Sequence, residues 1–307
     1  MSPSRGRIDT LAVVGGGFMG LGIAETAAAV GGLQVVVIDV DPDQLGSAKE
    51  KVRASLGRAV KGGKLAPDDG DDALERIEVS PDLQAVSAAD LVIEAVPENL
   101  ELKLGVMGEI ESVINSSTIV ASNTSSIPIA ELAAVFERPE RVLGLHFFAP
   151  VPVMRLVEVV NALDTSEATV VAAREFAERI GKRPIMTKDR SGFVVNMLLV
   201  PYLMAGVRMY EEGFATREDI DEGMRLGCGH PMGPLTLCDF IGLDVLYAVC
   251  DSLYEEFKRA EYAPPPLLKR MVASGRLGRK SGRGFYDYAD SERSQPAKPM
   301  SAVVGER

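Results

Sequence analysis

The chain has no tryptophan, two histidines and three cysteines, and this scarcity limits the functions open to it. The odd, sparse set of cysteines, Cys228, Cys238 and Cys250, argues against a disulfide framework and favours a reducing compartment. No CxxC pair occurs, and Cys228 near His230 supplies too few ligands for zinc. We therefore expect no metal site.

Long apolar runs and an excess of basic residues are also missing. No stretch approaches the ~20 apolar residues that a membrane span needs, and residues 1–9 lack the apolar segment of a signal peptide. Acidic residues number 44 and basic residues 33, which gives a net charge of −11. Such a chain is a poor candidate for non-specific binding to nucleic acid or to an anionic membrane. We expect a soluble, cytoplasmic protein.

What the sequence does contain is an alternation of short apolar segments and helical segments. The expected strands are residues 8–14, 34–39, 90–96, 118–121, 141–146 and 156–160, and the expected helices between them are 21–30, 100–114, 128–136 and 166–181. This alternation is typical of a doubly wound α/β fold of the Rossmann type, with a parallel sheet. A run of aspartates at 68–72 is interpreted as a solvated turn.

The pattern changes near residue 188, after which only helices are expected, at 192–210, 243–259 and 265–274. The first of these is apolar nearly all round, so it should be buried in a domain or at a subunit interface, with a kink at Pro201. The sequence thus predicts a nucleotide-binding domain over 1–187. An all-helical substrate or dimerisation domain over 188–290 and a flexible tail over 291–307 should follow.

A glycine fingerprint, Gly15-x-Gly17-x-x-Gly20, follows the first strand and opens the first helix. The first glycine should make the tight turn, the second should let the backbone approach a pyrophosphate, and the third should let helix and strand pack closely. The helix N-terminus adds partial positive charge. The residues expected at this cofactor site are Gly15, Gly17, Phe18, Met19, Gly20 and Asp39.

Asp39 ends the second strand, where a carboxylate accepts hydrogen bonds from the ribose hydroxyls of a dinucleotide and repels a 2′-phosphate. No arginine or lysine lies between Asp39 and Lys49. The sequence therefore predicts NAD as the cofactor in preference to NADP.

His146 ends a strand of the expected sheet, and ligands collect at the carboxyl ends of such strands. Glu158 interrupts an otherwise apolar strand, and a buried carboxylate needs a partner. The pair would serve as a general base with an orienting carboxylate that stabilises the imidazolium. The alternatives are a buried structural histidine, and an ion pair of Glu158 with Arg155 or Arg141.

Three further polar groups are candidates for ligand contact. Residues 121–126 join a strand to a helix, and their hydroxyls either cap that helix or reach a substrate oxygen. Asn196 lies in the apolar helix after Gly192 and either bonds another helix or faces a ligand. Lys51, Ser55 and Arg58 share one helix face, which is either a solvated surface or a site for a phosphate-bearing ligand.

Taken together, these motifs resemble the 3-hydroxyacyl-CoA dehydrogenase family, close to the bacterial 3-hydroxybutyryl-CoA dehydrogenases. The similarity runs from the glycine fingerprint to residues 282–286, and its most specific segments are 121–126 (ASNTSS), 146–154 (HFFAPVPVM) and 229–234 (GHPMGP). The family usually has asparagine in contact with the cofactor where this chain has Ala149.

The resemblance implies a role for individual residues. His146 would be the base and Glu158 its orienting carboxylate, while Ser125 and Asn196 would complete the catalytic group. The implied nicotinamide-nucleotide contacts are Glu98, Lys103, Ser125 and Lys280, and the implied substrate contacts are Ser55, Lys61, Ser125 and Asn196.

The implied reaction is the reversible NAD-dependent oxidation of a (3S)-3-hydroxyacyl-CoA, of short chain, in a homodimer formed through the helical domain. Two alternatives stay open at this point. One is a dehydrogenase of a free hydroxy acid, like gulonate dehydrogenase and lambda-crystallin. The other is an NAD-binding protein without enzymatic activity.

Overall fold

A computed structural model describes residues 7–288 of the chain. It divides into two compact units, Met1–Phe193 and Val194–Arg307, which are called here the N-terminal and the C-terminal unit. The sequence placed a domain boundary at residue 187, and its expected tail at 291–307 lies outside the described residues. Within residues 7–288 no helix combines the length and the apolar character that crossing a bilayer requires.

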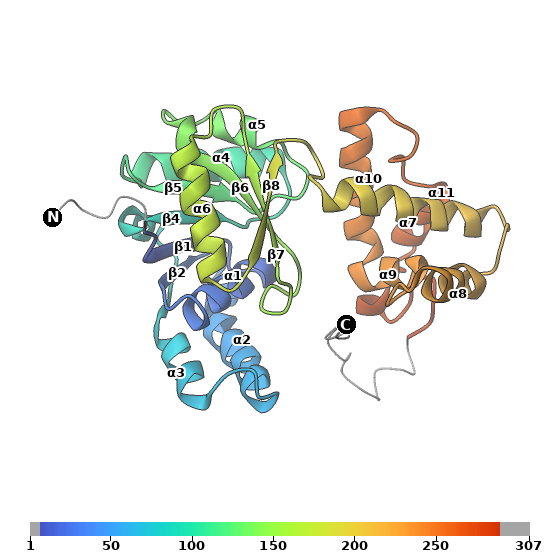
Figure 1. The fold of residues 1–307 in the computed structure, drawn as a ribbon, viewed down its shortest axis with the longest axis horizontal. Helices are drawn as coiled ribbons and strands as arrows, with labels where there is room; N and C mark the ends of the chain where they lie inside the picture. The colour runs from blue at the N-terminus through green and yellow to red at the C-terminus, as the bar shows by residue number, and fades with distance from the viewer. Residues whose placement is uncertain (1–6, 289–307) are drawn as a thin grey trace, which may run out of the picture. The chain divides into compact units, whose positions relative to one another are not determined.

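The N-terminal unit is built on one eight-stranded sheet with the order β3-β2-β1-β4-β5-β6-β7-β8 (Figure 1). The strands are β1 Thr10–Val14, β2 Gln34–Ile38, β3 Ile77–Ser80, β4 Leu91–Glu94, β5 Ile119–Ser122, β6 Val142–Phe147, β7 Leu156–Asn161 and β8 Arg183–Lys188. The strand order reverses beside β1, at the junction of β1 and β4, so the expected doubly wound α/β fold is confirmed. Ligands of such sheets collect at the carboxyl ends of the strands next to this reversal.

One neighbouring pair departs from the expected parallel arrangement, because β7 runs antiparallel to β6. The connection over 148–155 contains no helix, and a parallel crossover needs roughly a dozen residues or more. The chain therefore turns back directly. In the resulting register His146 lies opposite Glu158.

The two edge strands, β3 and β8, were not predicted. Both are only partly buried, and β8 carries exposed side chains at both of its ends, so neither contains a buried apolar run. Edge strands are covered by a neighbour on one side only, which explains the weak signal in their sequences.

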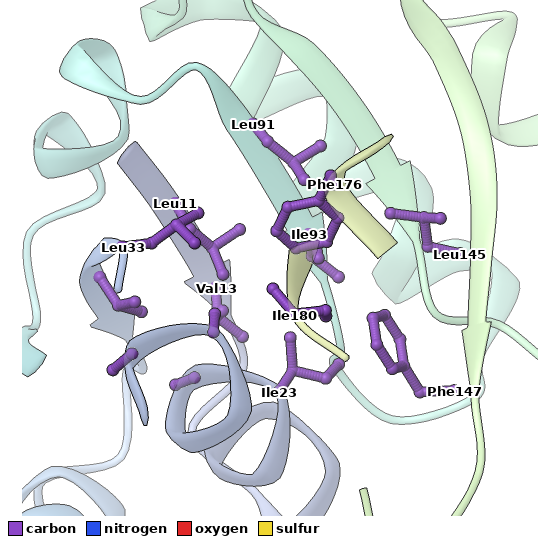
Figure 2. Close-up of a cluster of buried hydrophobic side chains, with 14 of the residues drawn as sticks. Leu11, Val13, Ile23, Leu33, Leu91, Ile93, Leu145, Phe147, Phe176 and Ile180 are labelled. Carbon is purple, nitrogen blue, oxygen red and sulfur yellow. The ribbon is translucent and has the colours of Figure 1, made fainter. Parts of the chain in front are cut away.

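Helices cover both faces of the sheet. They are α1 Phe18–Ala29, α2 Pro42–Lys61, α3 Pro67–Glu75, α4 Leu100–Val113, α5 Ile129–Ala133 and α6 Glu167–Arg179, with short 3₁₀ turns at Leu83–Ala88 and Pro139–Arg141. Side chains of α1 and α6 pack on one face, where Ile23 and Phe176 meet the strand residues drawn in Figure 2. Met107 of α4 and Leu132 of α5 pack on the other face. Truncating such side chains typically costs about 2–5 kcal/mol, so both layers hold the strand ends firmly.

The aspartate run at 68–72 forms part of α3, so its interpretation as a turn was wrong. Pro67 stands at the start of this helix, and Asp68 and Asp69 lie in its first turn. Proline at that position and acidic residues near a helix N-terminus both favour a helix.

The C-terminal unit is helical, as expected. Its helices are α7 Val195–Glu211, α8 Arg217–Cys228, α9 Pro234–Ile241, α10 Leu243–Phe257 and α11 Pro266–Ala273, with a 3₁₀ turn at Arg279–Ser281. Pro201 lies inside α7. That helix buries Leu203 and Val207 in the core of the unit but leaves Leu198 73% exposed.

Candidate active site

The glycine fingerprint adopts the geometry expected of a phosphate-binding turn. Gly15 has a backbone φ of +112°, which residues with a side chain rarely adopt. A Cβ at this position would lie 2.6 Å from the carbonyl oxygen of Ala95. A Cβ on Gly20 would lie 1.8 Å from the carbonyl oxygen of Gly15, so only glycine allows this close packing. Gly17 caps α1, and a Cβ added there would meet no heavy atom within 4 Å. That open space at a helix N-terminus fits a pyrophosphate.

Asp39 follows β2 and holds this turn in place. Its Oδ2 accepts a hydrogen bond of 2.6 Å from the amide of Gly16, and its Oδ1 accepts one of 2.9 Å from the amide of Asp41. The next side chain, Val40, is 91% exposed. Asp39 therefore shapes the phosphate turn in addition to its expected role toward a ribose.

The expected contact between His146 and Glu158 forms within the N-terminal unit. Nδ1 of His146 on β6 lies 2.6 Å from Oε2 of Glu158 on β7. Glu158 is fully buried and His146 is 6% exposed. Arg141, one of the alternative partners of Glu158, instead donates to the carbonyl oxygen of Ser117. A carboxylate on Nδ1 fixes the tautomer in which Nε2 is the acceptor, so the imidazole is arranged to take a proton at Nε2.

Two phenylalanine rings flank this imidazole. The ring of Phe148 lies 4.5 Å from that of His146, centroid to centroid, and the ring of Phe193 lies 5.5 Å away. Together they form an apolar wall beside the imidazole. Phe193 is the last residue of the N-terminal unit, and its φ of 47° is unusual for a residue with a side chain.

A buried lysine lies between two carboxylates at the end of β4. Lys103 is 1% exposed, and its Nζ lies 2.7 Å from Oε1 of Glu94 and 3.3 Å from Oε2 of Glu98. It also donates to the carbonyl oxygen of Val96. The ammonium therefore donates to two protein acceptors and has a second carboxylate beside it. A direct contact of Lys103 with a cofactor stays a prediction; in the structure this lysine holds Glu98.

Glu98 in turn gathers the hydroxyl-rich segment that was singled out in the sequence. Its Oε1 accepts from the amide of Ser125 at 2.9 Å and from the hydroxyl of Thr124 at 2.7 Å, and Oγ of Ser125 lies 3.3 Å away. Burial alone would raise the pKa of Glu98, but the charge of Lys103 and these donors outweigh it and lower the pKa. Glu98 thus stays ionised and fixes the position of Ser125.

The alternative interpretation of these hydroxyls as caps of the next helix was wrong. Pro128 stands at the N-cap of α5, and no hydroxyl caps the helix. The amides of Ile129 and Ala130 instead donate to the carboxylate of Asp189, at 2.8 and 2.7 Å. A carboxylate that lies 60 residues away in sequence replaces the local cap. The hydroxyls of Thr124, Ser125 and Ser126 instead donate to Glu98.

The basic face of α2 presents charge to solvent around a half-buried serine. Lys51 and Arg58 are exposed, as is Lys61 at the end of the helix. Ser55 lies between them, and its hydroxyl donates to Oε1 of Glu25 on α1, at 3.0 Å. Its lone pairs remain available to a donor from a ligand.

The other two predicted residues belong to the C-terminal unit. Asn196 lies in the first turn of α7 and is half-buried. Nζ of Lys280, in the 3₁₀ turn at Arg279–Ser281, lies 2.6 Å from the carboxylate of Asp244. Their contacts with substrate and cofactor stay predictions.

Two residues that shape the site were missed in the sequence. Glu94 binds Lys103, and its Oε2 accepts from the hydroxyl of Ser122; it was detectable as a charged residue in an apolar strand, the signal that identified Glu158. Asn123 accepts a hydrogen bond of 2.9 Å from the amide of Phe147, so it ties the end of β5 to the end of β6. No periodicity in the sequence indicates that contact.

The cofactor preference can be reversed at the end of β2. In the double variant Asp39→Asn, Val40→Arg, the amide oxygen can still accept from Gly16, while the repelling charge is gone and a guanidinium is added. We expect the ratio of the NADPH to the NADH dissociation constant to fall by about ten-fold or more, the worth of a charge-assisted hydrogen bond. Fluorescence titration with NADH and NADPH measures it. Val40→Arg alone keeps Asp39 and should keep the NAD preference; an unchanged ratio in the double variant would contradict the role of Asp39.

Comparison with known proteins places the chain in a family. Family models match residues 10–190 as the 3-hydroxyacyl-CoA dehydrogenase NAD-binding domain and residues 192–288 as the C-terminal domain of the same family. The chain is 48% identical over 283 residues to 3-hydroxybutyryl-CoA dehydrogenase of Mycobacterium tuberculosis, covering 92% of this chain and 99% of that one. It is 43% identical to the mitochondrial hydroxyacyl-coenzyme A dehydrogenase of Sus scrofa, covering 92% and 91% of the two chains.

A solved structure gives the same result. The crystal structure of (S)-3-hydroxybutyryl-CoA dehydrogenase PaaH1 from Ralstonia eutropha is 46% identical and superposes with a TM-score of 0.87, covering 92% of this chain and 99% of that one. These relatives give no support to a dehydrogenase of free hydroxy acids or to a non-enzymatic NAD-binding protein. The chain belongs to the 3-hydroxyacyl-CoA dehydrogenase family.

Proposed function

We propose that this protein oxidises the 3-hydroxyl of a short-chain (3S)-3-hydroxyacyl-CoA with NAD, and that His146 is the general base. The observation that carries the proposal is the buried hydrogen bond between His146 and Glu158, which lies among the carboxyl ends of the strands where the NAD-binding turn also lies. The coarser conclusion, an NAD-dependent 3-hydroxyacyl-CoA dehydrogenase, rests on the family.

The residues fit the cofactor. The open space at Gly17 and the N-terminus of α1 suit the pyrophosphate, and Asp39 suits a ribose without a 2′-phosphate. When bound, NAD would supply the acceptor for the hydride from C3 of the substrate. Glu98, Lys103, Ser125 and Lys280 are the further residues proposed to support it.

The proton is the part of the reaction that this chain handles itself. As the hydroxyl of the substrate becomes a carbonyl, its proton passes to Nε2 of His146, and the ring becomes an imidazolium. Glu158 accepts from Nδ1 and stabilises the positive charge as it forms. The rings of Phe148 and Phe193 keep competing water away from Nε2.

Ser125 and Asn196 are proposed to orient the substrate oxygens. The amide of Ser125 is fixed on Glu98, so its hydroxyl starts from a defined position. Ser55 and Lys61, with Lys51 and Arg58 beside them on α2, are proposed to hold the coenzyme A portion through its phosphates.

The acid–base assignment can be tested on two variants. His146→Gln should lower kcat by roughly 10²–10⁴, the usual worth of a positioned general base, with little change in NAD affinity. Glu158→Gln should lower kcat and move the acidic limb of its pH profile to lower pH, because a neutral amide stabilises the imidazolium less. NADH formation from 3-hydroxybutyryl-CoA measures both.

His230→Gln provides the matched control, since it removes the second histidine, which contacts Tyr202 in the C-terminal unit. It should keep the turnover of the wild type. Near-normal kcat in His146→Gln would refute the assignment. If Glu158→Gln lowers thermal stability but leaves the pH profile in place, the glutamate is a structural partner only.

The role of α2 can be tested by reversing charge on one helix face. Lys51→Glu with Arg58→Glu should raise KM for an acyl-CoA far more than for the corresponding pantetheine thioester, which lacks the nucleotide phosphates. The effect should shrink with salt, since exposed charges are screened beyond ~8–10 Å. Lys49→Glu with Arg53→Glu makes the same charge change on the opposite face and should leave both KM values near those of the wild type. Equal effects on both substrates would indicate a solvated surface.

We also infer a homodimer formed through the C-terminal unit, in the cytoplasm. Three large apolar side chains of that unit are strongly exposed, Leu198, Phe214 and Leu226, and exposed apolar surface of this kind, where it is contiguous, is usually covered by a partner. Three free cysteines suit a reducing compartment. Light scattering should give twice the mass of the chain, and Leu198→Glu should reduce it; a monomer in the wild type would contradict the inference.

A further inference from the structure

A second buried charge lies close to the catalytic strands but takes no part in the proposed chemistry. Lys182 immediately precedes β8 and is 8% exposed. Its Nζ donates to the carbonyl oxygens of Val151 and of Met154, the latter at 2.9 Å. Both acceptors belong to the connecting segment, defined here as residues 148–155, which joins the strand of His146 to the strand of Glu158.

The connecting segment also packs against α1. Val151 is 2% exposed, and a Cβ on Gly22 of α1 would lie 3.0 Å from the Cβ of Val151. Val151 therefore packs against the bare backbone of α1 while its carbonyl oxygen is held by Lys182. A segment without secondary structure is fixed in this way at a single residue by apolar packing and by an ammonium group.

Burial of the ammonium costs solvation free energy. Burial lowers the pKa of Lys182 to about 8, and the charge of Glu25 opposes this shift. Burial likewise raises the pKa of Glu25. The hydrogen bond from Ser55 and the charges of Arg58 and Lys182 oppose this rise. An attraction between two buried charges is weak evidence for stability, because desolvation offsets most of it. A methionine at 182 would fill similar space without that cost.

The connecting segment carries Phe148, and this explains why Lys182 holds it. Phe148 begins it, three residues before Val151, and its ring lies 4.5 Å from the ring of His146. Loss of the hold on Val151 and Met154 would free the chain on which Phe148 is mounted. The ring of Phe148 beside His146 would then be free to move. The hydrogen bond from His146 to Glu158 would remain.

We propose that Lys182 is a positioning residue for the reaction, which holds Phe148 against His146 by binding the carbonyl oxygens of Val151 and Met154. It acts through the connecting segment and touches neither substrate nor cofactor. The proposal rests on the proposed role of His146 as the base. A misplacement of about 1 Å at a reacting group costs up to roughly 10²-fold in rate, so the effect should be visible in kcat.

The test is removal and chemical replacement of the ammonium. Lys182→Ala removes three carbons and an ammonium, which are the atoms of propylammonium. We expect kcat to fall by roughly 10–100-fold, with the KM for NAD and the acidic limb of the pH profile near those of the wild type. Propylammonium should restore part of the lost kcat in a saturable way. Tetramethylammonium, which has no N–H donor, should restore none.

Lys188→Ala is the matched control, since it removes an exposed lysine at the other end of the strand that Lys182 precedes. It should turn over normally and should not respond to propylammonium. An unchanged kcat in Lys182→Ala would overturn the proposal, as would a loss that propylammonium does not relieve in protein that circular dichroism shows to be folded.

If Lys182→Ala does not fold, Lys182→Met, which keeps the stem of the side chain, takes its place. A folded Lys182→Met with the kcat of the wild type would also overturn the proposal, and a loss in kcat without a rise in the KM for NAD would support it. The proposed base is tested separately by His146→Gln. Normal turnover in His146→Gln would refute the assignment of His146. The kcat of each Lys182 variant is instead compared with the kcat of the wild type.

Discussion

The site depends on the antiparallel pairing of β6 with β7. A parallel arrangement of these two strands would need a longer crossover connection between His146 and Glu158. The direct return of the chain puts the two residues opposite one another, and the resulting contact of 2.6 Å is buried. Much of the remaining polar structure supports these two strands or the neighbouring strand ends.

Carboxylates recur around the site, and each holds the donors of a different segment. Asp39 binds the glycine turn, Glu98 binds the Ser125 segment, and Asp189 binds the start of α5. At α5 these charge-assisted hydrogen bonds take the place of a local side-chain cap. Loops that carry functional groups are thereby fixed by charges from other elements, a pattern suited to a site that must be in place before the substrate arrives.

The sequence was sufficient wherever the signal was local. The glycine spacing with Asp39 predicted the phosphate turn, and single charges in apolar strands predicted buried partners, as Glu158 shows and as Glu94 would have shown. It failed where the structure depends on distant segments. The edge strand β8 has no apolar run, the capping of α5 by Asp189 joins segments far apart in the chain, and the direction of β7 follows from the length of the connection and not from the composition of the strand.

The residues that follow β8 connect an anchored carboxylate to the ring of Phe193. The carboxylate of Asp189 is clamped to two amides of α5, so the chain leaving the sheet is anchored at that residue. A few residues on, Gly192 and Phe193 adopt φ of 81° and 47°, and Val194 opens the second unit. The backbone torsions of this short stretch therefore set where the ring of Phe193 lies relative to the anchored Asp189. Because the ring of Phe193 rests 5.5 Å from that of His146, twisting the stretch would turn a side chain against the imidazole.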